Sequence, residues 1–190
     1  PSSGGHVIDL GASLGGASER LVERYGSRCR FTLAESSPPM IETLTQRYEP
    51  SIESGIVRVE HLDLRRSFPE GPPADVVLCV LTLQFVPVTY RPALLRRMYD
   101  ALRPGGVLLL SEKLIPPSAH TSELLTRLYH DVKREHGYSE EAVRQKSESL
   151  EGVLVPLSAS ANEEMIRAAG FGEVECYWRS LLFGAWLAVK

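Results

Sequence analysis

The first half of the chain alternates between two kinds of block. Short runs rich in apolar and β-branched residues predict strands at residues 6–10, 30–34, 56–59, 75–81 and 107–110. Between them, apolar residues recur with helical spacing over residues 17–25, 39–48 and 90–102. Apolar strands that alternate with helices predict a parallel sheet with helices on both faces.

The helix predicted at 90–102 is amphipathic, and we expect its Arg91, Arg96 and Arg97 to be solvated. Its apolar face consists of Leu94, Leu95, Met98 and Leu102. The sequence RPGG at 103–106 should stop this helix and turn the chain into the next strand. Prolines and glycine between Asp63 and Asp75 predict a loop there.

The second half has a different pattern. Helices are predicted at 118–136, at 137–153 with a polar surface, and at 162–169. Two final strands, 173–179 and 185–189, are joined only by SLLFG, which predicts a hairpin and an antiparallel edge to the sheet. We interpret residues 1–190 as one domain in which 114–160 form a helical insertion or lid-side region.

Composition narrows the function only slightly. The net charge of −3 gives no bulk electrostatic reason to expect binding to nucleic acid or to an anionic membrane. Cys29, Cys79 and Cys176 lie too far apart in sequence for a zinc motif or a disulfide framework, which fits a reducing cytoplasm. We expect no membrane span and no metal. Because the chain starts at Pro1, almost inside a strand, we also expect that a natural N-terminal segment is missing.

The most specific local feature is the glycine-rich turn after the first predicted strand. A dinucleotide fingerprint, G-x-G-x-x-G, needs its second glycine so that the backbone can approach a pyrophosphate. Here the turn from Gly11 to Gly15 carries Ser13 at that place. The turn is therefore tight but is not built around phosphate.

Acidic residues stand at or beside the ends of three predicted strands. Glu35, 24 residues after Gly11, can accept hydrogen bonds from both hydroxyls of a ribose. Together with Asp9 and Asp63 it predicts an acidic rim, which suits a cationic, adenosine-bearing ligand without phosphates: S-adenosylmethionine (SAM). The alternative is a plain strand–helix turn with solvated charges. The glycine turn, Glu35 and Asp63 follow three successive strands, and this combination favours a cofactor site.

The motifs DLGASLGGAS, AESSPPMIE, LDLR, VVLCVLTLQF, LRPGGVLLLSEK and GFGEVECYW resemble those of class I SAM-dependent methyltransferases. Within that class, TLQF, LSEK, HDVKR and GYSE resemble the carboxy-SAM synthases, which make the carboxymethyl donor for wobble-uridine modification of tRNA. The resemblance covers almost the whole chain. It implies a Rossmann-like, mostly parallel seven-stranded sheet.

The resemblance also implies how SAM, or its product S-adenosylhomocysteine (SAH), would be held. Gly11, Ala12 and Ser13 would line its methionine and ribose, Glu35 and Ser36 its ribose, and Asp63 and Leu64 its adenine. Val80 would lie beneath the sulfonium. The full set of cofactor residues is Asp9, Gly11, Ala12, Ser13, Gly15, Glu35, Ser36, Met40, Asp63, Leu64, Val80 and Leu81.

Several departures from the family favour ordinary SAM over carboxy-SAM. Ser147 replaces the arginine that pairs with the extra carboxylate, although Arg144 on the same helix is a candidate substitute. Val80 replaces an asparagine. The family's N-terminal lid, with a cofactor-contacting tyrosine, has no counterpart in this chain.

Methyl transfer depends mainly on positioning the nucleophile and excluding water, and an oxygen nucleophile needs a base in some enzymes. We predict Glu112, His130 and Tyr138 as catalytic candidates. Candidates for substrate binding are Gln84, Phe85, Arg134, Arg144 and Ser147. The alternatives are a solvated strand end for Glu112, a solvated helix face for His130 with Arg134, and a core position for Phe85.

Three functions stay open from the sequence. The first is a methyltransferase for a small-molecule acceptor, as in specialised metabolism. The second is a carboxy-SAM synthase that uses SAM and prephenate. The third is a non-catalytic SAM-binding or scaffold domain, and for each of them homodimerisation is left open.

Overall fold

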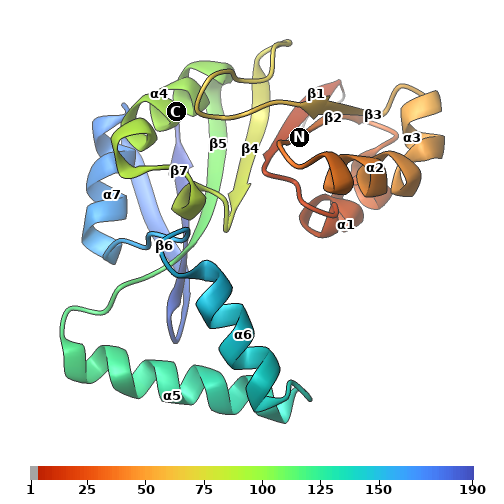
Figure 1. Cartoon of the computed structure of the whole chain (residues 1–190). Coiled ribbons are helices and arrows are strands. Elements are labelled where there is room, and N and C mark those ends of the chain that lie inside the picture. The colour runs from red at the N-terminus through yellow and green to blue at the C-terminus, as the bar shows by residue number, and fades with distance from the viewer. Residues whose placement is uncertain (1–3) are drawn as a thin grey trace.

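A seven-stranded sheet in the order β3-β2-β1-β4-β5-β7-β6 forms the centre of the computed structural model, which describes residues 4–190 (Figure 1). The strands are β1 (Gly5–Leu10), β2 (Cys29–Glu35), β3 (Val57–His61), β4 (Ala74–Val80), β5 (Leu102–Lys113), β6 (Glu173–Ser180) and β7 (Phe183–Val189). Strands β1 to β5 are parallel, and β7 pairs antiparallel with β5 and with β6. The predicted α/β class and the C-terminal hairpin are confirmed.

Helices cover the sheet on two sides. They are α1 (Gly16–Tyr25), α2 (Pro38–Arg47), α3 (Glu49–Glu53), α4 (Arg91–Ala101), α5 (Ala119–Glu135), α6 (Glu140–Leu150) and α7 (Ala159–Ala168), with 3-10 turns η1 (Leu83–Phe85) and η2 (Val88–Tyr90). Figure 1 shows α1, α2 and α3 on one side and α4 and α7 on the other. Each side has its own apolar core, one around Leu94, Leu95 and Met98 of α4 and one around Phe31 and Leu33 of β2.

Helices α5 and α6 form an arm that extends away from these layers (Figure 1). Helix α5 has no buried residue and α6 buries only Val143. Serine side chains cap both helices, Ser118 on the backbone N–H of Thr121 and Ser139 on that of Ala142. Local hydrogen bonds therefore define the arm more than core packing does.

Two predicted boundaries were wrong. Strand β5 begins at Leu102 instead of residue 107, because the RPGG segment pairs with the end of the chain: Gly105 donates to the carbonyl of Lys190, and Lys190 donates to that of Gly106. The helix expected at 39–48 ends at Arg47 and is followed by the separate short helix α3, which has a proline in its first turn.

Arg91 is not solvated, which corrects the prediction for α4. Arg96 and Arg97 are exposed as expected, but Arg91 is only 1% exposed. It is the first residue of α4, and its guanidinium turns inward, where backbone carbonyl groups accept its hydrogen bonds.

The sheet is less completely covered than predicted. Along β5, Leu108 and Leu110 are buried against α4 and α7, whereas Val107 and Leu109 on the opposite face are only half-buried. Their strand partners on β7, Val189 and Leu187, are half-buried too. Among the described helices, none is long and apolar enough to cross a membrane.

Candidate functional site

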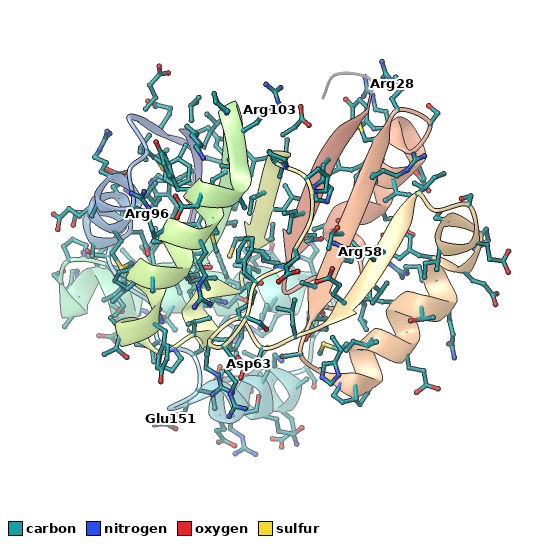
Figure 2. All side chains as sticks on the ribbon, turned by 90° about the horizontal axis from the view of Figure 1, so that it is seen from above. Arg28, Arg58, Asp63, Arg96, Arg103 and Glu151 are labelled. Carbon is teal, nitrogen blue, oxygen red and sulfur yellow. The ribbon has the colours of Figure 1, made fainter. Side chains whose placement is uncertain are left out.

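The residues predicted to hold the cofactor gather at one edge of the sheet. Because β1 to β4 are parallel, the loops that follow them all leave from their carboxyl ends. In Figure 2, Asp63 lies at this edge, as does Glu151 in the segment after α6, whereas Arg28 and Arg103 lie at the opposite edge. Open α/β sheets bind their ligands at the carboxyl edge.

The glycine turn presents backbone without side chains. Gly11 has φ +73°, and a Cβ atom there would collide with the side chain of Thr82. Gly15 has φ +83°, and a Cβ atom there would lie 2.6 Å from the ring of Tyr48. Both positions require glycine, for backbone conformation and for space.

Glu35 is 8% exposed and lies beside this turn. Its Oε1 accepts hydrogen bonds from the backbone N–H groups of Ser36 (2.7 Å) and Ser37 (3.0 Å), and its Oε2 accepts one from Ser13 (2.9 Å). Since a carboxylate oxygen can accept two hydrogen bonds, Oε2 keeps one position among the described contacts for a donor from a ligand. A ribose hydroxyl fits that position, so this edge suits the adenosine part of SAM.

Asp9 does not belong to an exposed acidic rim, which corrects the sequence interpretation. It is 1% exposed and accepts a 2.6 Å hydrogen bond from Ser18 Oγ in α1. Burial raises its pKa to about 6, Ser18 lowers it, and the nearby charge of Glu35 raises it further. Asp9 therefore links β1 to α1, the two elements that the glycine turn connects.

Asp63 stays at the surface and is held by its neighbour. Both of its carboxylate oxygens accept hydrogen bonds from Arg65 Nε at 2.9 Å. These bonds, together with the Arg65 backbone N–H, lower the pKa of Asp63 to about 2, so it is ionised at neutral pH. Leu64, which follows it, is buried, and Met40 is 37% exposed with its sulfur 3.6 Å from Ser13 Oγ.

Two exposed apolar residues end β4. Val80 and Leu81 are 37% and 39% exposed, and Leu81 has φ +54°, a conformation rarely adopted outside glycine. Val80 borders a pocket of about 260 Å³ beneath α1, with Ala17 and Arg20. Leu81 borders a larger cavity between the strand ends and the arm.

This larger cavity, about 620 Å³, is the main hollow of the site. It is lined by Leu81, Gln84, Phe85, Lys113, Tyr129, Lys133, Lys146, Ser147, Glu148, Leu150, Glu151, Leu154, Pro156 and Phe183. Of the residues predicted to bind substrate, Gln84, Phe85 and Ser147 are here. The amide of Gln84 is engaged by the protein, since Lys113 N–H donates to its Oε1 (2.9 Å) and its Nε2 donates to the Leu81 carbonyl (3.2 Å).

Sequence reasoning missed the cations of this cavity, Lys113, Lys133 and Lys146. The pKa of the Lys113 ammonium is lowered, first by burial and then by the charge of Lys133. Two acids share the cavity, but Glu148 is already paired with Arg144 at 2.8 Å. Strand alternation was the available signal: Lys113 lies on the opposite face of β5 from the core residue Leu110.

Glu112 is not at a solvated strand end and does not line this cavity. It is 2% exposed, on the core face of β5, and its Oε1 accepts a hydrogen bond from the Leu83 N–H (3.1 Å). Burial raises its pKa to about 8, while the charge of Arg91 and backbone N–H groups of the η1 turn lower it. Glu112 therefore lies behind η1 and holds its backbone through the Leu83 N–H.

The remaining candidates lie on the arm. His130 is half-buried beside the ring of Tyr129, and Tyr138 is 56% exposed with the Lys133 ammonium 5.8 Å from its ring centre. Within residues 4–190, no group of three or more His, Cys, Asp or Glu side chains is placed to hold a metal ion.

The two predicted arginines are exposed and paired on the arm itself. Arg134 bonds to Asp131 and lies 3.6 Å from Glu140, and Arg144 pairs with Glu141 and Glu148, both at 2.8 Å. The structure therefore does not bring Arg144 into the cavity that Ser147 lines.

Comparison with known proteins identifies the class. A family model described as a methyltransferase domain matches residues 7–106. Among solved structures, human N-acetylserotonin methyltransferase in complex with SAM has a TM-score of 0.65 at 21% identity, over 97% of this chain and 47% of that one. PigF with SAH has a TM-score of 0.68 at 16% identity, over 97% and 50%. The chain spans about half the length of these structures, which share its fold. The protein therefore belongs to the SAM-dependent methyltransferase class.

Curated relatives place it more narrowly. A carboxy-S-adenosyl-L-methionine synthase from Chromohalobacter salexigens is 39% identical, over 98% of this chain and 69% of that protein. The enzyme of the same name from Trichlorobacter lovleyi is 35% identical, over 98% and 77%. Within the class, the chain is a member of the carboxy-S-adenosyl-L-methionine synthase family.

Proposed function

We propose that this enzyme transfers the methyl group of SAM to a small anionic acceptor bound in the 620 Å³ cavity. The observation that carries the proposal is the position of that cavity. It opens beside Leu81 at the end of β4, and Lys113, Lys133 and Lys146 line it. Ammonium groups in a partly buried cavity favour a carboxylate or another anion.

The chain's own residues have separate tasks in this scheme. The Gly11–Gly15 turn and Glu35 bind the cofactor, and SAM supplies an electrophilic methyl group when bound. Phe85, Tyr129 and Phe183 offer aromatic surface to the acceptor and keep water away from it. Lys113 fixes its negative charge, and orientation then supplies most of the acceleration.

A second candidate, synthesis of carboxy-SAM from SAM and prephenate, is favoured by the names of the curated relatives. By the resemblance in sequence, Ser147 stands where that family carries its carboxylate-binding arginine, and a serine offers a single hydroxyl instead of a bidentate fork. Arg144, the substitute considered from the sequence, is engaged with Glu141 and Glu148. These two facts support methyl transfer over carboxy-SAM synthesis.

Mass spectrometry separates the two candidates. The protein is incubated with SAM alone, with SAM and prephenate, and with SAM and a panel of aromatic carboxylates. We expect SAH together with a methylated form of one of the aromatic carboxylates. Carboxy-SAM in the prephenate reaction would support the second candidate. No turnover of SAM in any reaction would contradict both candidates. Lys113→Met should raise the KM of the acceptor at least tenfold, with Arg97→Met, an exposed residue of α4, as the matched control.

A further inference from the structure

Three buried polar side chains have no part in the proposed chemistry: Arg91 and Glu112 lie behind the cavity, and Gln84 lines it. Arg91, Glu112 and Gln84 are 1%, 2% and 4% exposed. A buried charge is costly unless its hydrogen bonds are satisfied, so the partners of these groups show what they hold in place.

Arg91 binds two segments that are far apart in sequence. Its Nε donates to the Val86 carbonyl (2.8 Å), and one terminal nitrogen donates to the carbonyls of Gln84 (3.2 Å) and Val155 (2.7 Å). Val155 in turn donates its N–H to the Gln84 carbonyl at 2.9 Å. The guanidinium therefore joins the turn after β4 to the segment that returns from the arm.

Glu112 complements this arrangement from the other side of the same turn. Its carboxylate accepts from the backbone N–H of Leu83, whereas Arg91 takes the carbonyls that follow. Glu112 thus accepts from an N–H group at the start of this turn, and Arg91 donates to carbonyl groups that follow it. Leu81, which has an unfavourable positive φ, is held beside this turn by Gln84, whose Nε2 donates to the Leu81 carbonyl (3.2 Å).

Both joined segments are walls of the cavity. Leu81 and Phe85 belong to the turn, and Leu154 and Pro156 flank Val155 on the returning segment. We propose that Arg91 is a positioning residue, which sets the distance between these two walls and so adapts the cavity to its acceptor. Arg91 is buried and does not line the cavity, so it acts only through these two walls. The claim that the cavity is adapted to an acceptor rests on the function proposed above.

A lysine could not replace this arginine fully. Three carbonyl groups around one side chain match the planar, multi-donor guanidinium, whereas an ammonium is a point charge on a flexible stem. A purely structural role of Arg91 would also make its loss costly, so the test must compare local with global effects.

The first test is hydrogen exchange measured by mass spectrometry on Arg91→Met, Arg91→Lys and the control Arg97→Met. In Arg91→Met, we expect peptides spanning 81–87 and 152–157 to exchange at least tenfold faster, while peptides from β1 and β2 keep their wild-type rates. Arg91→Lys should be intermediate and Arg97→Met unchanged. Unchanged exchange in both segments, or an equal rise throughout the sheet, would overturn the proposal; should Arg91→Met not fold, Arg91→Lys decides by the same criterion.

The second test is calorimetry with SAH and with prephenate as an anionic probe. Arg91→Met should weaken prephenate binding at least tenfold and SAH binding less than threefold, with partial recovery in Arg91→Lys. An equal loss for both ligands would overturn a role in setting the cavity. If prephenate does not bind the wild-type protein, prephenate is excluded as a ligand of this cavity, and hydrogen exchange alone decides the role of Arg91.

Discussion

At the scale of single residues, identical chemical groups behave differently because their surroundings differ. Asp63 is beside Arg65 at the surface, and its pKa falls to about 2. Asp9 is buried below the glycine turn, and its pKa rises to about 6. Glu112 is buried behind η1, and its pKa rises to about 8. Burial thus keeps Asp9 and Glu112 protonated up to a higher pH than Asp63, whose neighbouring arginine favours the ionised form.

Glu35 is the residue on which cofactor binding should depend most. Glu35→Ala removes an acceptor for the ribose hydroxyls and for the backbone N–H of Ser13, so SAH binding should weaken by about 1.5–3 kcal/mol. Isothermal titration calorimetry measures this loss. Glu42→Ala, at an exposed position of α2, is the control, and equal SAH affinity in Glu35→Ala and wild type would contradict the assignment.

Glu112 should make stability depend on pH in a recognisable direction. Its pKa is raised from 4.5 to about 8 in the folded protein, so between these values the folded state binds more protons than the unfolded state. The free energy of unfolding should therefore fall as pH rises, by up to about 1.4 kcal/mol per pH unit, and level off above about pH 8. Urea denaturation at pH 6.5 to 9 measures it, and because the pKa of Asp9 is about 6, Asp9 adds to the fall only near the lower end of this range.

Glu112→Gln keeps a carbonyl oxygen for the Leu83 N–H but cannot ionise. The fall in stability between pH 7 and 8 should therefore be much smaller in this variant than in the wild type. The same slope in the variant and in the wild type would show that another group titrates.

At the scale of elements, the turn between β1 and α1 depends on its neighbours in space. Its shape is set by the positive φ of Gly11 and by the contact with Thr82, which follows β4. The turn is also tied to β2, because Gly11 and Ala12 both donate to the Ala34 carbonyl. Three strands therefore define one loop.

Gly11→Ala tests this dependence. The new methyl group collides with Thr82 and the residue must keep a left-handed conformation, so SAH binding should fall at least tenfold and the melting temperature should fall as well. Gly16→Ala is the control, since a Cβ atom there meets nothing within 4 Å. Calorimetry and thermal denaturation follow both, and wild-type affinity in Gly11→Ala would contradict this account of the turn.

At the scale of the whole molecule, the cavity is made jointly by the sheet and the arm. The strand ends contribute Leu81 and Lys113, and the arm contributes Lys133 and Ser147. The cavity proposed for the acceptor is therefore formed by parts of the chain that pack only loosely on one another, because α5 has no buried residue.

Ser147→Arg should restore a strong carboxylate site at this junction. A guanidinium there can pair with the carboxylate of carboxy-SAM, so affinity for it should rise at least tenfold over wild type, while SAH affinity changes little. Arg144→Ala should leave both affinities unchanged, because Arg144 is held by Glu141 and Glu148. Competition binding with carboxy-SAM measures both, and a loss of carboxy-SAM binding in Arg144→Ala would assign the carboxylate to Arg144 instead.

The sequence by itself determined the order and type of nearly all elements, the parallel sheet with its C-terminal hairpin, and the carboxyl edge of the sheet at which Gly11, Glu35 and Asp63 lie. These follow from short-range periodicity and from the common direction of parallel strands. Only the tertiary structure decided that Arg91 and Glu112 are buried while Lys113 faces the cavity. The environment of a charged side chain is made by segments distant in sequence, such as Val155 around Arg91, and no local pattern encodes those contacts.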